Sequence, residues 1–190
     1  MHACKGGYLD IAELLLSKGV GVDRRDTKER YTALMMASHH NHVEIVRLLV
    51  SEGVGADVDL KDDDGRTALH RTSINGNLEI AELLTSSGAD VNIRDDEGMT
   101  ALHRASLVSG SLEIVQLLLC QGADMSIKTY YGVTGLDYAL FRGHLKVADC
   151  LRRWPWTMAI IALKEDLAIY YLLDASTIID LWQYLGQGNK

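Results

Sequence analysis

The chain of 190 residues is long enough for one domain or an elongated array, and its 47% hydrophobic and 24% charged residues are ordinary for a packed protein. The net charge of −7 gives no electrostatic reason to bind nucleic-acid phosphates, and the single proline argues against a proline-rich linker. The three cysteines contain no Cys-x-x-Cys pair, which indicates reduced thiols in a cytoplasmic or nuclear compartment and not a secreted protein.

One pattern recurs along the chain with a period of about 33 residues, which predicts stacked supersecondary units. The units lie near 1–29, 30–64, 65–97, 98–131 and 132–153. In each complete unit a threonine predicts the N-cap of a first helix, and Leu-x-Ile-x-x-Leu-Leu or a close variant predicts a second helix. The expected caps are Thr32, Thr67, Thr100 and Thr134. Connectors rich in Asp and Gly predict turns between units.

Three units depart from this spacing. The first unit lacks the Thr-Ala-Leu start of its first helix, so we expect either missing upstream sequence or a frayed half-repeat. The second unit has two extra residues, which we place in the loop at 53–57 because loop insertions cost little. The fourth unit has one extra residue, which falls within 107–110 between its two helices.

The last part of the chain, 154–190, is less regular. Pro155 should end the second helix of the fifth unit. We interpret 157–173 as a degenerate sixth repeat, with one continuous helix as the alternative, and 177–185 as a C-terminal capping helix. A membrane span at 154–173 is not expected, because Lys164, Glu165 and Asp166 lie at its centre.

These motifs resemble ankyrin repeats over roughly residues 1–153. The sequence Thr-Ala-Leu-His at 67–70 and 100–103 matches the Thr-Pro-Leu-His signature of that family. Met35 and Asp137 replace the histidine in two other units. The resemblance implies an all-α solenoid of stacked helix-turn-helix units. It also implies that His70 and His103 hydrogen-bond the motif threonine and neighbouring backbone, and do not act in catalysis.

No other residues suggest chemistry. The sequence shows no Ser/His/Asp or Cys/His constellation, so we expect no enzyme activity and no cofactor. His39, His40 and His42 straddle a helix bend without an acidic or Cys ligand to complete a set of four, so we expect a solvated helix end and no metal site.

The resemblance also implies protein–protein recognition on a concave face made of turn tips and first helices. Carried over by position, the expected contact residues are Arg30, Met36, Asp63, Asp64, Arg66, Arg71, Asp96, Glu97, Met99, Arg104, Tyr130, Tyr131 and Tyr138. Arg71 and Arg104 are expected where a polar residue is free to vary, and the acidic tips are either solvated or bind a basic partner segment. Tyr138 and Phe141 either contact a partner or pack against the C-terminal cap.

We therefore expect an adaptor or scaffold that binds another protein, and neither nucleic acid nor membrane. The alternatives are a recognition fragment of a larger ankyrin protein and a self-associating structural array. A monomer is the expected state, with end-to-end self-association through the unfinished first unit as the alternative.

Overall fold

The computed structural model describes residues 1–154, which contain helices and no strand. The helices are α1 (His2–Gly6), α2 (Leu9–Ser17), α3 (Ala33–His39), α4 (Val43–Val50), α5 (Ala68–Asn75), α6 (Leu78–Ser86), α7 (Ala101–Arg104), η1 (Ala105–Ser109), α8 (Leu112–Cys120) and α9 (Gly135–Arg142). Residues 145–154 are also helical. Met1–Leu151 form one compact unit, and the chain from Arg152 belongs to a second.

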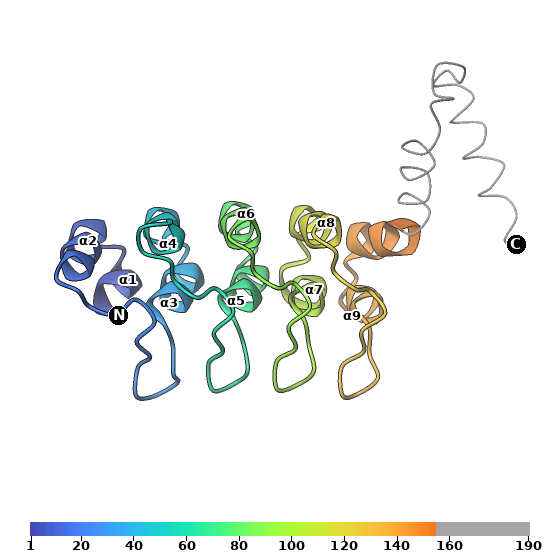
Figure 1. The fold of residues 1–190 in the computed structure, drawn as a ribbon. Coiled ribbons are helices and arrows are strands. Elements are labelled where there is room, and N and C mark those ends of the chain that lie inside the picture. Colours follow the sequence, from blue (N-terminus) through green and yellow to red (C-terminus); the bar gives the residue numbers. More distant parts are fainter. Residues whose placement is uncertain (155–190) are drawn as a thin grey trace, which may run out of the picture. The chain divides into compact units, whose positions relative to one another are not determined.

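Within Met1–Leu151 the helices form two layers, as expected for stacked pairs (Figure 1). The first helices α1, α3, α5, α7 and α9 lie in one layer, and the second helices α2, α4, α6 and α8 lie in the other. The loops that join successive units project beyond the first-helix layer, away from the second helices. Fully buried apolar side chains from both layers form the core, among them Leu34, Ile45, Leu69, Ile80, Leu102 and Ile114. The predicted all-α solenoid is confirmed.

The first helices begin where the threonines predicted. The Thr32 hydroxyl accepts the Met35 N–H at 3.2 Å, and the Thr134 hydroxyl accepts the Asp137 N–H at 3.3 Å. Thr67 and Thr100 occupy the same N-cap position. These first helices end at residues in the left-handed region, such as Gly76 with φ 81° and Asn41 with φ 59°.

The extra residues lie where the spacing placed them. Those of the second unit are in the loop after α4, where Gly55 and not Gly53 takes a positive φ. The one in the fourth unit widens the end of the first helix into the π-helical turn η1, which closes at Gly110 with φ 59°. A single inserted residue is commonly absorbed as such a turn because the helix can continue around it.

Side chains also connect neighbouring units. The Asn92 amide donates to the Gly122 carbonyl at 3.1 Å, and its oxygen accepts the Asp124 N–H at 2.8 Å. His42 donates through Nε2 to the Lys5 carbonyl at 3.0 Å. These bonds join adjacent units to each other.

The predictions for 157–173 and 177–185 lie outside the described residues. In the part that the structure describes, no helix is long and apolar enough to cross a membrane.

Candidate functional site

The loops that project beyond the first helices are tight turns, here called the tips, each organised by one side chain. In three tips that side chain is an aspartate. Asp26 accepts the N–H groups of Glu29 and Tyr31, at 3.0 and 3.1 Å. Asp62 accepts the N–H groups of Asp64 and Arg66, both at 2.9 Å. Asp95 accepts those of Glu97 and Met99, at 3.0 and 2.9 Å. A carboxylate that accepts several backbone N–H groups holds a turn in one conformation.

Backbone hydrogen bonds join each tip to the next one. The Asp63 N–H donates to the Glu29 carbonyl at 3.1 Å, and the Asp96 N–H donates to the Asp64 carbonyl at 3.0 Å. The Tyr130 N–H continues the series with the Glu97 carbonyl at 3.2 Å. Because each tip is bonded to its neighbour, the tips form one continuous surface.

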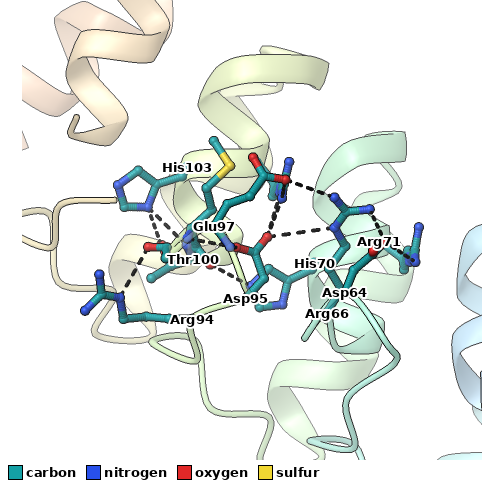
Figure 2. Close-up of polar contacts among 12 residues, drawn as sticks. Asp64, Arg66, His70, Arg71, Arg94, Asp95, Glu97, Thr100 and His103 are labelled. Atoms are coloured by element: carbon teal, nitrogen blue, oxygen red, sulfur yellow. Dashed lines mark hydrogen bonds and ion pairs between the residues drawn. The ribbon is translucent and has the colours of Figure 1, made fainter. Parts of the chain in front are cut away.

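Ion pairs reinforce this surface from beneath (Figure 2). Arg104 from α7 pairs with the buried Asp95 and with Glu97, the latter at 2.9 Å. Arg66 bridges two tips, because it contacts Asp64 at 2.8 Å and Glu97 at 3.2 Å. Burial tends to raise the pKa of Asp95, but hydrogen bonds from Arg104 and from the Met99 N–H outweigh burial and hold this pKa below its ordinary value.

The preceding unit repeats this arrangement. Arg71 from α5 pairs with Asp62 at 2.5 Å, and its guanidinium lies over the ring of Tyr31, 4.7 Å from the ring centroid. Burial, followed by a hydrogen bond with Glu29, raises the pKa of the Tyr31 phenol to about 12.

The two motif histidines act in the structure as the resemblance implied. His70 Nδ1 accepts the Thr67 N–H at 3.2 Å, so Nε2 carries the proton and donates to the Met99 carbonyl at 3.1 Å. His103 Nδ1 accepts the Thr100 N–H at 3.1 Å. Burial lowers the pKa of His70 to about 4 and also lowers that of His103, so both rings are neutral at pH 7.

Three predicted contact residues are buried, which corrects the expectation that they are open to a partner. Arg71 and Arg104 are not free polar positions, because each is paired beneath a tip with an aspartate. Met99 is only 1% exposed. Its N–H donates to the Asp95 carboxylate, and its carbonyl accepts the Asp95 N–H and Nε2 of His70 in the preceding unit.

The other predicted residues remain accessible on the tips and first helices. Arg30, Asp63, Asp64, Asp96 and Glu97 are exposed, and Met36, Arg66 and Tyr138 are half-buried. Tyr130 and Tyr131 expose 69% and 78% of their surface. The Arg94 guanidinium lies 5.0 Å from the ring centroid of Tyr130, and Tyr138 meets the edge of His103.

The structure also reveals residues that the sequence interpretation missed. Asp62 and Asp95 are the buried anchors of their tips, and Arg94 supports Tyr130. A signal was present: in both units an arginine follows the aspartate by nine residues. Asp and Arg at a fixed separation in consecutive repeats indicate a repeated internal pair.

The three histidines of the second unit interact with one another and with backbone. The rings of His40 and His42 stack 6.1 Å apart, and His40 Nδ1 lies 3.1 Å from the Met36 carbonyl. Among residues 1–154, no group of three or more His, Cys, Asp or Glu side chains could hold a metal ion.

Known proteins share this sequence pattern. A family model described as ankyrin repeats (3 copies) matches residues 1–95, 50–129 and 88–154. The chain is also 33% identical over 84 residues to the ankyrin repeat and KH domain-containing protein mask-1 of Caenorhabditis elegans. That alignment covers 44% of the chain and 3% of the relative, so the chain spans a small part of that protein's length. The family model covers most of the chain, and the chain therefore belongs to the ankyrin-repeat family.

Proposed function

We propose that the chain is a non-catalytic recognition module, an adaptor or scaffold, that binds another protein on the concave face of tips and first helices. The observation that carries this proposal is the exposure of Tyr130 and Tyr131 on a tip that is hydrogen-bonded to its neighbour. Tyrosine is enriched among residues that dominate binding energy, because its ring adds contact area with few rotatable bonds. Ankyrin repeats are in general protein–protein interaction modules.

The rigidity of the tips supports the same proposal. Binding costs free energy when loops must become ordered, so a preformed surface keeps more of its contact energy. The tips are already held by the Asp62 and Asp95 turns and by the ion pairs of Arg66. A partner would meet this surface with little rearrangement.

The charge of the tips favours a partner segment that carries Lys or Arg beside an apolar residue. Asp63, Asp64 and Asp96 have exposed side chains, and the exposed tyrosines follow on the next tip. The net charge of −7 agrees with this chemistry and disfavours nucleic acid.

We place the chain in the cytoplasm or nucleus, without cofactor or membrane attachment, because its sequence has isolated cysteines. A recognition segment of a larger ankyrin protein is the alternative, favoured by the small part of the relative's length that the chain spans.

Affinity capture from cell lysate tests the proposal with two matched variants. Tyr130→Ser combined with Tyr131→Ser removes the exposed rings, while Val108→Ser changes an exposed apolar residue in η1, away from the tips. With both variants folded by circular dichroism, proteins retained by the wild type and by Val108→Ser should be lost from the double variant. Retention of the same proteins by all three would show that the tips are not the binding surface.

A further inference from the structure

Two of the three cysteines lie on neighbouring second helices. Cys120 is the last residue of α8, and Cys150 lies in the helix 145–154 of the fifth unit. Figure 1 shows this helix beside α8. Hydrogen bonds from its own backbone N–H and from Ser111 lower the pKa of Glu113 in α8, and the charge of Lys146 in the last helix lowers this pKa further. The two helices are therefore close enough for their side chains to interact.

Each cysteine replaces a residue type that recurs at its position in the repeat. The position of Cys120 carries an exposed serine in the first three units: Ser17, Ser51 and Ser86. The position of Cys150 carries a half-buried leucine in the second, third and fourth units: Leu48, Leu83 and Leu117. A thiol occupies both positions only where the fourth unit meets the fifth.

An ion pair between two other units gives the register of these positions. Arg47 of α4 pairs with Glu79 of α6 at 2.9 Å. Arg47 is the fifth residue of its helix and Glu79 the second of its helix, so the offset is three residues. Cys120 is the ninth residue of α8 and Cys150 the sixth of the helix 145–154, which is the same offset one turn further along. The two cysteines therefore occupy facing positions.

The two thiols also influence each other. Burial, followed by the negative charges of Asp149 and Cys120, raises the pKa of the Cys150 thiol. A charge shifts the pKa of another group only when the two are near each other. Facing residues of two packed helices have Cα atoms about 4–6 Å apart, which matches the separation that a disulfide spans. Cys120 is exposed, so solutes reach this thiol first.

We propose that Cys120 and Cys150 form a redox-sensitive pair, which a hydroperoxide converts into a disulfide that fastens the fifth unit to the fourth. The Cys120 thiolate attacks hydrogen peroxide, so an S–O bond forms, the O–O bond breaks, and hydroxide leaves and takes up the proton of the thiol. The Cys150 sulfur then attacks the Cys120 sulfenic acid, so the S–S bond forms, the S–O bond breaks, and a second water leaves with the Cys150 proton. Two thiols lose two electrons, and one peroxide is reduced to two waters. A small thiol reverses the reaction by exchange.

Mass spectrometry of the full chain tests the proposal. The reduced, folded chain is treated with hydrogen peroxide, denatured, and its remaining thiols are blocked with N-ethylmaleimide. The wild type should become a monomer with one blocked thiol, on Cys4, which is buried in α1. Digestion without reductant should release a peptide that joins Cys120 to Cys150. The bond should form at least about tenfold faster in the folded chain than in urea, because folding holds the two thiols together.

The repeat itself supplies matched variants. Cys120→Ser and Cys150→Leu restore residues that other units carry at these positions, so both should fold, as circular dichroism would verify. Neither should form a disulfide within a monomer. Cys4→Ala leaves the pair intact and should react at the rate of the wild type.

The thermal midpoint gives a second readout. The bond closes the loop 120–150, so oxidation should raise the midpoint of the wild type by about 4 °C or more, and a thiol reductant should reverse the rise. Peroxide should not raise the midpoint of Cys150→Leu.

Three results would overturn the proposal. The first is a folded wild type that keeps three blocked thiols or forms a disulfide only between two copies. The second is equal rates of bond formation in the folded chain and in urea. The third is an oxidised chain whose midpoint is unchanged or lower, which would mean that the bond does not fit the stacked units.

Discussion

The pair of Asp95 and Arg104 should be the most sensitive point of the tip surface. Asp95 is fully buried and accepts two backbone N–H groups and the Arg104 guanidinium. The substitution Asp95→Ala removes all of these acceptors and leaves a buried guanidinium with only the exposed Glu97 as partner.

The expected cost follows from the contacts that are lost. Removal of one partner of a buried ion pair costs about 3–5 kcal/mol, because the other charge remains desolvated. Glu97 still pairs with Arg104, so we expect the lower part of that range, about 3–4 kcal/mol. Asp95→Asn keeps an oxygen for the turn, but its NH2 group faces the Arg104 guanidinium and cannot accept from it, so this variant should lose about as much, about 3–4 kcal/mol.

Urea unfolding at pH 7, followed by circular dichroism, measures these differences as shifts of the midpoint. The double variant Asp95→Ala with Arg104→Met contains no unpaired buried charge. The double variant should lose less stability than the two single variants lose in sum, by about 1 kcal/mol or more. Additivity of the single losses would refute the reasoning, because it would mean that the two side chains do not depend on each other.

Three further predictions concern His70, Gly98 and the π-helical turn η1. The pKa of His70 is about 4 in the folded chain and near 6.5 when unfolded, so the unfolded state binds more protons between these pH values. The contribution of His70 to the free energy of unfolding should therefore be fully present above about pH 6.5 and decrease as the pH falls toward 4. His70→Gln keeps a donor and an acceptor and should reduce that fall by about 1.4 kcal/mol per pH unit, measured by urea unfolding across this range. Gly98→Ala places a methyl group 2.9 Å from the Tyr130 nitrogen, whereas Gly132→Ala, at a similar φ, meets nothing within 4 Å. The first should therefore lose about 1–3 kcal/mol more than the second in urea unfolding, and equal losses would argue against close contact between the tips. Deletion of Val108 should turn η1 into a regular helix with little change in the thermal midpoint of unfolding. Deletion of Ile74 from the regular helix α5 should lower that midpoint, because it rotates the residues that follow by about 100° around the helix axis.

Local sequence was sufficient to predict the helix pairs and their limits. A threonine before Ala-Leu satisfies N–H groups at the helix start, and Gly76 or Asn41 accepts the left-handed conformation at the end. These effects act within a few residues, so they can be recognised without the rest of the fold. The extra residue near 107–110 was located in the same way, although its π-helical form was not predicted.

The burial of Arg71, Arg104 and Met99 could not be predicted in this way. An arginine on a first helix is equally compatible with solvent and with an internal pair, and the difference depends on a carboxylate nine residues earlier. Met99 lies against the preceding unit, where His70 of α5 donates to the Met99 carbonyl. Contacts between units decide these positions, and a repeat motif describes only one unit at a time.

Amide hydrogen exchange on the isolated chain most directly tests the claim that the tips form one preformed surface. The N–H groups of Asp63, Asp96 and Tyr130 each donate to a carbonyl of the neighbouring tip. They should exchange at least about a hundredfold more slowly than in an unfolded chain, which corresponds to a local opening free energy near 3 kcal/mol. Exchange of all three at the unfolded-chain rate would show that the tips move independently and would contradict recognition by a rigid surface.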